Sequence, residues 1–138
     1  AQLIFLDTPG IYEAKSKFDK FLVEKASSSL READLILFMT QVPNSKPNKD
    51  EFITKTFLST KTPMILVINK IDQVKKEALL PLMETYASLF NFQKIIPISA
   101  LKTSGIDILL KEVVTFLPEG PQYFPPDMIT DLPERFLE

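Results

Sequence analysis

The sequence has no cysteine and no histidine, and only three of its 138 residues are glycine. Without thiols or imidazoles the chain can form neither a disulfide framework nor a Cys/His zinc site. Catalytic schemes that need a histidine base or a cysteine nucleophile are excluded for the same reason. The absence of cysteine also fits a cytosolic protein.

A strong charge of one sign and long apolar runs are missing as well. The net charge is −2 and basic residues are scattered among acidic ones, so no nucleic-acid face is visible, and any RNA contact would lie elsewhere. No apolar run approaches the roughly 20 residues of a membrane span, and no signal peptide is visible. A 138-residue chain that is 45% hydrophobic has enough apolar material for one domain with a core.

The most informative stretch is residues 64–72, an apolar run that continues into the polar tetrad Asn-Lys-Ile-Asp. Residues 64–68 are all apolar and do not alternate with polar residues, which predicts a strand covered on both faces, as in a parallel sheet with helices on each side. In such sheets ligands bind at the carboxyl ends of strands. Asn69, Lys70 and Asp72 are placed there.

These three side chains suit guanine. The carboxylate of Asp72 can accept two parallel hydrogen bonds from the ring N–H and exocyclic amino group of guanine, an edge that adenine does not offer. Asn69 can read the other edge and tie neighbouring loops together, and the aliphatic stem of Lys70 can lie along the base. The alternative is an ordinary turn in which Asp72 caps the next helix.

Strands and amphipathic helices alternate along the chain. Proline is tolerated only in the first turn of a helix, so Pro81 moves the expected start of the third helix toward residue 80, and Pro97 predicts an edge strand. The expected order is a strand at 2–6, helix 18–33, strand 34–40, helix 50–59, strand 64–68, helix 78–90, strand 94–98 and helix 106–117. This alternation predicts an α/β fold with a parallel sheet and right-handed crossovers.

Three loops follow strand ends on the same rim of this predicted sheet. Asp7 can hold Mg²⁺ through water, and the unobstructed N–H of Gly10 can approach a terminal phosphate. Residues 99–101 can offer backbone N–H groups to the guanine oxygen. Taken singly, a Pro-Gly turn and a Ser-rich helix entry are commoner readings. Together and in this order, the loops favour a guanine-nucleotide site.

These motifs at these spacings resemble the later guanine-nucleotide motifs of the translation-factor-related GTPases, and essentially the whole chain is similar to the Era-like GTPase family. The resemblance implies a P-loop NTPase-type G domain, three-layered with a mostly parallel central sheet and here incomplete at the N-terminus. It implies binding of GTP or GDP with Mg²⁺. The implied binding residues are Asp7, Thr8, Pro9, Gly10 and Ile11 on the phosphate and Mg²⁺ side, and Asn69, Lys70, Asp72, Ser99, Ala100 and Leu101 on the guanine side.

Residues 118–138 differ in character, with five of the eleven prolines. They are similar to the segment that joins the GTPase domain of this family to an RNA-binding KH domain, so residues 1–117 are expected to be a partial GTPase domain, with the KH domain outside this chain. A disordered tail is the alternative. The resemblance implies an intact cytoplasmic protein that hydrolyses GTP, assists small ribosomal subunit assembly through ribosomal RNA, and contacts the membrane peripherally.

The sequence departs from the family pattern on the phosphate side. No glycine precedes a Lys-Ser or Lys-Thr pair, so the phosphate-binding loop has no counterpart, and the switch-one threonine is also missing. Ile11 stands where Ras-like enzymes have a water-positioning glutamine. We therefore expect the intact protein to contain an N-terminal part, and the 138 residues alone to fold poorly, bind nucleotide weakly and not hydrolyse it.

Two alternative functions remain open at this stage. The chain can be a non-hydrolysing interaction module in which the nucleotide-binding fold serves as a docking surface. It can also belong to another Era-like ribosome-assembly GTPase. Nucleotide titration separates the first alternative from a GTPase, and the sequence downstream of residue 138 separates the second.

Overall fold

The computed structural model describes residues 3–5, 32–47 and 61–119, and the structural statements below concern those residues. The predicted strands 34–40, 64–68 and 94–98 and the predicted helices 78–90 and 106–117 are confirmed to within a few residues. The predicted helix 50–59, and helix 18–33 except for its last two residues, lie outside the described part. The elements in chain order are β1 (Ile36–Gln41), β2 (Met64–Asn69), the 3₁₀-helix η1 (Ile71–Gln73), α3 (Lys76–Leu89), β3 (Lys94–Pro97) and α4 (Ile106–Phe116).

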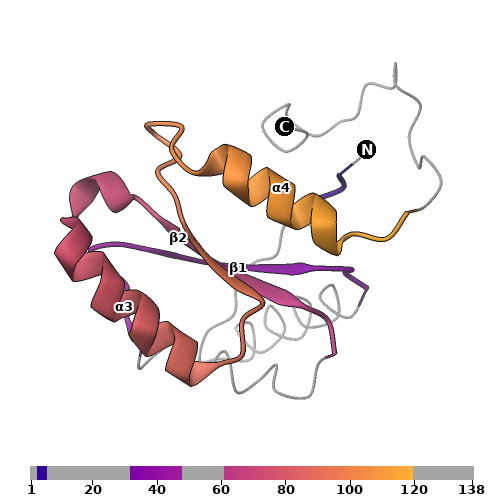
Figure 1. Ribbon diagram of the computed structural model, residues 1–138, viewed down its shortest axis with the longest axis horizontal. Helices are drawn as coiled ribbons and strands as arrows, with labels where there is room; N and C mark the ends of the chain where they lie inside the picture. The colour runs from indigo at the N-terminus through magenta and orange to yellow at the C-terminus, as the bar shows by residue number, and fades with distance from the viewer. Residues whose placement is uncertain (1–2, 6–31, 48–60, 120–138) are drawn as a thin grey trace, which may run out of the picture.

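The three strands form one parallel sheet in the order β1-β2-β3 (Figure 1). Ile36 pairs with Met64 at one end of β1, and Gln41 pairs with Asn69 at the other. Pro97, which pairs with Ile68, lies on the edge strand β3 of this sheet, as its missing N–H predicts. The parallel arrangement brings the carboxyl ends of all three strands to one rim.

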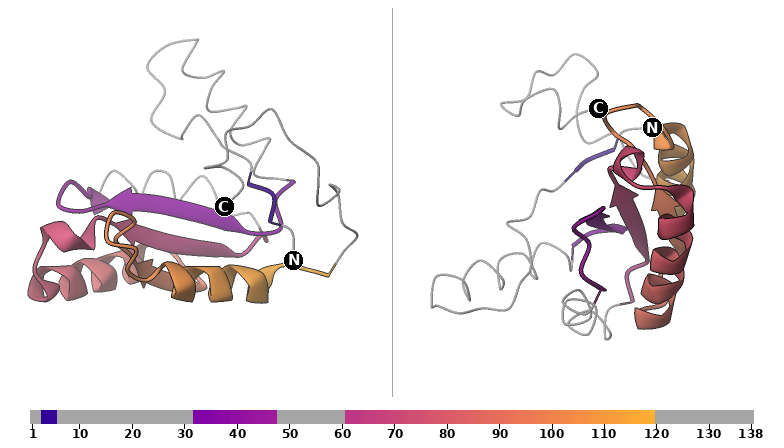
Figure 2. Two further views of the ribbon diagram at one scale, coloured as in Figure 1. Left: turned by 90° about the horizontal axis from the view of Figure 1, so that it is seen from above. Right: turned by 90° about the vertical axis from the view of Figure 1, so that its left-hand side faces the viewer.

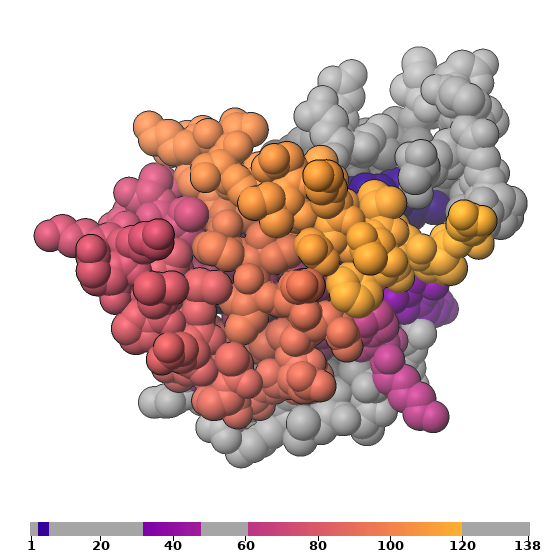
Figure 3. Space-filling view, in the orientation of Figure 1, coloured from indigo at the N-terminus to yellow at the C-terminus, as the bar shows by residue number. Residues whose placement is uncertain are grey.

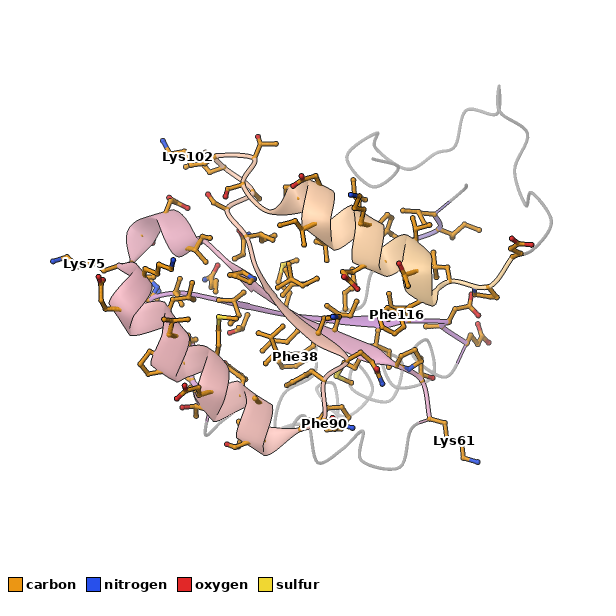
Figure 4. All side chains as sticks on the ribbon, viewed as in Figure 1. Phe38, Lys61, Lys75, Phe90, Lys102 and Phe116 are labelled. Atoms are coloured by element: carbon orange, nitrogen blue, oxygen red, sulfur yellow. The ribbon has the colours of Figure 1, made fainter. Side chains whose placement is uncertain are left out.

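Two helices cover opposite faces of the sheet, and this gives the three layers predicted from the sequence. Residues 64–68 of β2 are buried, and Ile65 to Ile68 each have no exposed surface, so apolar side chains leave the strand on both faces. Leu66 and Ile68 pack with Leu79 and Tyr86 of α3. Ile65 and Val67 of β2 pack on the other side with α4, whose Phe116 is labelled in Figure 4. The strands accordingly run between α3 and α4 in Figure 1, and the helices lie along them in Figure 2.

The predicted strand at residues 2–6 is not found in its described part. Residues 3–5 have no regular structure, and Ile4 is 48% exposed. A strand forms only where a neighbour accepts its backbone hydrogen bonds, and the described sheet of β1, β2 and β3 does not include this segment. The apolar pattern of residues 2–6 indicates strand propensity, but the predicted strand is wrong for residues 3–5, because no strand of the described sheet pairs with them.

The expected start of the third helix near residue 80 is also wrong. α3 begins at Lys76 and contains Pro81 in its second turn. A proline there removes one backbone hydrogen bond, the one to the carbonyl of Glu77. Leu79 and Tyr86, on either side of Pro81, are both buried in the core. Burial of two large side chains contributes more than the lost hydrogen bond costs, so the helix extends through the proline.

Replacement of Pro81 should therefore stabilise the fold. Pro81→Ala restores an N–H donor to the carbonyl of Glu77 at an exposed position. We expect the free energy of unfolding to rise by about 1–2 kcal/mol, since the roughly 3 kcal/mol propensity gain is partly offset by the greater freedom of the unfolded chain. Urea denaturation measures this. Glu84→Ala, at an exposed position of the same helix, is the control and should change stability by less than about 0.5 kcal/mol.

Candidate functional site

The segments that follow β2 and β3 lie side by side at the carboxyl rim of the sheet. Backbone hydrogen bonds join them: the N–H of Ile98 donates to the carbonyl of Ile68 at 2.8 Å, and the N–H of Ile71 donates to that of Ile98 at 3.2 Å. The end of β1 is attached as well, because the N–H of Val42 donates to the carbonyl of Asn69 at 3.1 Å. These hydrogen bonds join the segments after β1, β2 and β3 into one platform, which carries the predicted base-binding residues.

Asn69 connects the two loops of this platform through its side chain. Its Oδ1 accepts hydrogen bonds from the backbone N–H of Lys70 at 2.7 Å and of Ala100 at 3.1 Å. The bond to Ala100 confirms that Asn69 ties neighbouring loops together, as the sequence predicts. With Oδ1 engaged in this way, the two N–H donors on Nδ2 remain for a ligand, since they make no hydrogen bond within the described part of the chain.

Asp72 is held by Ser99 from the neighbouring loop. The hydroxyl of Ser99, a residue only 1% exposed, donates to Oδ1 of Asp72 at 2.6 Å. The same hydroxyl oxygen accepts the backbone N–H of Lys102 at 3.2 Å. A hydroxyl has a single proton, so these two contacts fix its direction toward Asp72. Oδ2 of the exposed Asp72 carboxylate is left as the acceptor for an incoming ligand.

The structure rules out the alternative in which Asp72 only caps the next helix. α3 begins at Lys76, its N-cap residue is Lys75, and no side chain caps it. Asp72 lies instead inside η1, the short 3₁₀-helix that precedes α3. The carboxylate is therefore not engaged with the N-terminal amides of α3, and its contact with Ser99 is a different interaction.

Lys70 adopts a backbone conformation that few side chains favour. Its φ of 64° and ψ of 33° are left-handed, and its N–H donates to Asn69 as described above. Such a conformation costs about 1 kcal/mol or more for a residue other than glycine, and it persists where the surroundings hold it. It lets β2 turn directly into η1, which brings Asp72 to the rim. Placement of the Lys70 stem along a base stays a prediction.

Two of the three backbone amides of residues 99–101, which the sequence predicts to face the guanine oxygen, already donate hydrogen bonds within the protein. The N–H of Ser99 donates to the carbonyl of Ser104 at 3.0 Å, and that of Ala100 donates to Asn69. The N–H of Leu101 makes no hydrogen bond within the described residues. Leu101 is also 80% exposed, at the surface loop between β3 and α4 that Figure 3 shows at upper left in orange. Of the three amides, that of Leu101 is therefore the one open to a ligand without rearrangement.

A hollow of about 400 Å³ lies next to this platform, lined by Met39, Thr40, Gln41 and Asn69. The end of β1 therefore borders the candidate site, which the sequence analysis did not predict. The available signal was the change from apolar to polar at Thr40 and Gln41, at the same strand end as Asn69 in the paired register. Polar residues at the carboxyl end of β1 indicate a ligand-binding edge, as the polar residues that follow β2 do.

The predicted phosphate-side residues lie outside the described part of the chain. They are Asp7, Thr8, Pro9, Gly10 and Ile11. The Mg²⁺ site at Asp7 accordingly stays a prediction.

Figure 4 shows Lys75 and Lys102 extending away from the body at the end where η1 and the loop after β3 lie. Within residues 3–5, 32–47 and 61–119, no helix is both long and apolar enough to cross a membrane.

Comparison with known proteins identifies relatives of this chain. The model of the elongation factor Tu GTP binding domain matches residues 1–119. The chain is 47% identical over 136 residues to a GTPase Era from Geotalea uraniireducens, and 48% identical to one from Alkaliphilus metalliredigens. Each match covers 99% of this chain and 46% of the relative, so the chain spans about half the length of these proteins.

Solved structures agree with this assignment. A crystal structure of Era in complex with MgGDPNP and nucleotides 1506–1542 of 16S ribosomal RNA superposes with a TM-score of 0.82 at 45% identity, covering 96% of this chain and 46% of that one. A variant of SsGBP, with a TM-score of 0.65 at 18% identity over 80% of this chain and 41% of its own, shares the fold. The chain belongs to the elongation factor Tu GTP-binding domain family and is an Era-like G domain.

Proposed function

We propose that this chain supplies the guanine-recognition half of a protein that binds and hydrolyses GTP. The observation that carries the proposal is the hydrogen-bonded pair of loops in which Ala100 holds Asn69 and Ser99 holds Asp72. A carboxylate and an amide, each fixed by a neighbouring loop, form a preorganised edge for a planar base. The solved Era complex contains MgGDPNP, a guanine nucleotide, which supports the same ligand class here.

Each side chain has a definite part in base recognition. Oδ2 of Asp72 accepts from the ring N–H or amino group of guanine, and the Nδ2 donors of Asn69 face the acceptors on the other edge. The Leu101 amide is available to the guanine oxygen, and the Lys70 stem covers a face of the ring. Adenine offers Asp72 an acceptor nitrogen in place of the ring N–H. A bound adenine would cover the carboxylate and leave it facing an acceptor, which is costly, so the site rejects adenine nucleotides.

The phosphate side of the proposed site depends on residues 7–11 and on a phosphate-binding loop that this chain does not contain. Asp7 would hold Mg²⁺ through water, and Mg²⁺ would neutralise charge on the phosphates. Glycine at position 10 allows its N–H to approach a phosphate. No residue of this chain is assigned as the catalytic base. We therefore propose that the 138 residues alone bind guanine nucleotides weakly and do not hydrolyse GTP.

The intact protein is proposed to assist assembly of the small ribosomal subunit. The solved Era structure contains a segment of 16S ribosomal RNA, and relatives are about twice the length of this chain. Ribosomal RNA would be bound by a KH domain that follows the linker at residues 118–138, in the cytoplasm. The contact with the cytoplasmic face of the membrane has no support among the described residues and stays a prediction.

Nucleotide titration tests this proposal. The protein as encoded in full is titrated with GDP and with ADP, and GDP should bind at least about a hundredfold more tightly, because ADP leaves Asp72 facing an acceptor. Steady-state release of phosphate from GTP then tests hydrolysis. Guanine binding without hydrolysis leaves recognition intact and overturns the enzymatic part. Equal, weak affinity for both nucleotides defeats the proposal and favours an interaction module.

A further inference from the structure

The loop between β3 and α4, residues 99–105, closes on itself beside the guanine-side residues. Ser99 and Ser104 form an antiparallel bridge, with the N–H of Ser99 on the carbonyl of Ser104 at 3.0 Å and the N–H of Ser104 on that of Ser99 at 2.9 Å. Inside the loop Thr103 has a left-handed φ of 57°, and its N–H donates to the carbonyl of Ala100 at 3.3 Å. Both backbone polar groups of Ser99 are therefore fixed by Ser104.

Gly105, at the end of this loop, lies against the end of β3. A side-chain Cβ there would lie 2.7 Å from the carbonyl oxygen of Pro97 and 3.2 Å from Cγ2 of Ile98, and its φ is +79°. Neither neighbour can move freely, because Pro97 is paired with Ile68 of β2 and the N–H of Ile98 donates to the carbonyl of Ile68. A side chain at residue 105 would therefore displace the loop, not the strand.

Displacement of the loop would disturb the hydrogen bonds that hold Asp72 and Asn69, the two side chains proposed to bind the edges of the base. Ser99, through its hydroxyl, holds Oδ1 of Asp72 at 2.6 Å. Ala100, through its N–H, holds Oδ1 of Asn69 at 3.1 Å. Hydrogen bonds weaken steeply as the angle at the hydrogen falls toward about 120°, so a partner that moves out of line weakens them. The approach of the loop to β3 at Gly105 thus controls the direction of the Asp72 carboxylate and of the Asn69 amide.

We infer that Gly105 is a positioning residue for guanine recognition, acting through Ser99 on Asp72 and through Ala100 on Asn69. The inference rests on the proposed function and adds to it a residue that does not touch the base. The Gly105 carbonyl also accepts the N–H of Leu109 at 3.0 Å in the first turn of α4. A test must therefore separate an effect on the loop from a loss of stability in α4.

The test compares Gly105→Ala with Val113→Ala in the protein as encoded in full. Val113 is 5% exposed on α4 and is not part of the loop. Affinities are measured for GDP and for IDP, whose base lacks the amino group from which Asp72 would accept a hydrogen bond. Wild type should prefer GDP by about tenfold or more, since hydrogen bonds to a charged group are the stronger kind. Gly105→Ala should lose about tenfold in GDP affinity and most of this preference, whereas Val113→Ala should keep both within twofold.

A second variant and a second measurement protect the test against misfolding. Ser99→Ala keeps the glycine but removes the hydroxyl on the route to Asp72, and it should lose most of the preference as well. Amide hydrogen exchange without nucleotide should be faster for Lys102 and Ser104 in Gly105→Ala than in wild type. The inference is overturned if Gly105→Ala keeps the wild-type preference and affinity, if Ser99→Ala keeps the preference, or if exchange is unchanged. A wild type that binds neither nucleotide defeats the proposed function instead.

Discussion

Asp72→Asn should change the base preference of the intact protein from guanine to xanthine. The hydroxyl of Ser99 donates to Oδ1 of Asp72, so the oxygen of the new amide is expected to remain on Ser99 and its amino group to replace Oδ2. That amino group would then oppose the donors of guanine. Xanthine has a carbonyl oxygen in place of the guanine amino group and can accept from it. We expect GDP affinity to fall by at least about a hundredfold and XDP to bind better than GDP.

Direct titration with GDP and XDP measures this switch. Asp107→Asn is the matched control, because it makes the same chemical change at an exposed residue in the first turn of α4. It should leave both affinities within about twofold, with at most a small loss of helix stability. An unchanged GDP to XDP ratio in Asp72→Asn would show that the carboxylate does not contact the base. A uniform loss for both nucleotides would point to a structural role through Ser99.

Much of this site could be predicted because its determinants are contiguous in the sequence. The unbroken apolar run of β2 predicts a strand covered on both faces, which the structure confirms. The polar residues after it predict a ligand at its carboxyl end, which stays a prediction. The helix predicted at residues 106–117 likewise agrees with the bounds of α4 to within one residue. In both cases the local pattern and the tertiary environment favour the same outcome, which is the condition under which pattern reasoning succeeds.

The features that were missed depend on contacts between distant residues. No periodicity shows that the Ser99 hydroxyl donates to Asp72. The same holds for Pro81, whose preference for the first turn of a helix placed the expected start near residue 80, whereas α3 begins at Lys76. Leu3–Phe5 is the converse case, because strand propensity is present without a paired neighbour in the described sheet. Tertiary hydrogen bonds and core packing decide these positions, and a single sequence does not record them.

Tyr86→Ala should be the most destabilising of the substitutions considered. The ring of Tyr86 has no exposed surface and packs with Val42, Leu66, Ile68 and Leu79 between α3 and the sheet. Its hydroxyl is within hydrogen-bond reach of Thr40 Oγ1 at 3.3 Å, at the end of β1 that borders the candidate site. Truncation of a buried aromatic side chain costs about 3–5 kcal/mol, because both the transfer energy and the packing around the new cavity are lost.

A loss of that size is a large share of the roughly 5–15 kcal/mol that holds a domain folded. Urea denaturation of the intact protein should therefore show a midpoint shift near the limit of a measurable folded baseline. Tyr86→Phe, which keeps the ring and removes only the hydroxyl, should cost about 1 kcal/mol. Leu80→Ala, at a 53% exposed position of the same helix, should cost less than about 0.5 kcal/mol. Equal losses for Tyr86→Ala and Leu80→Ala would mean that α3 is not anchored through Tyr86, and that the end of β1 beside Asn69 is held by the strand pairing alone.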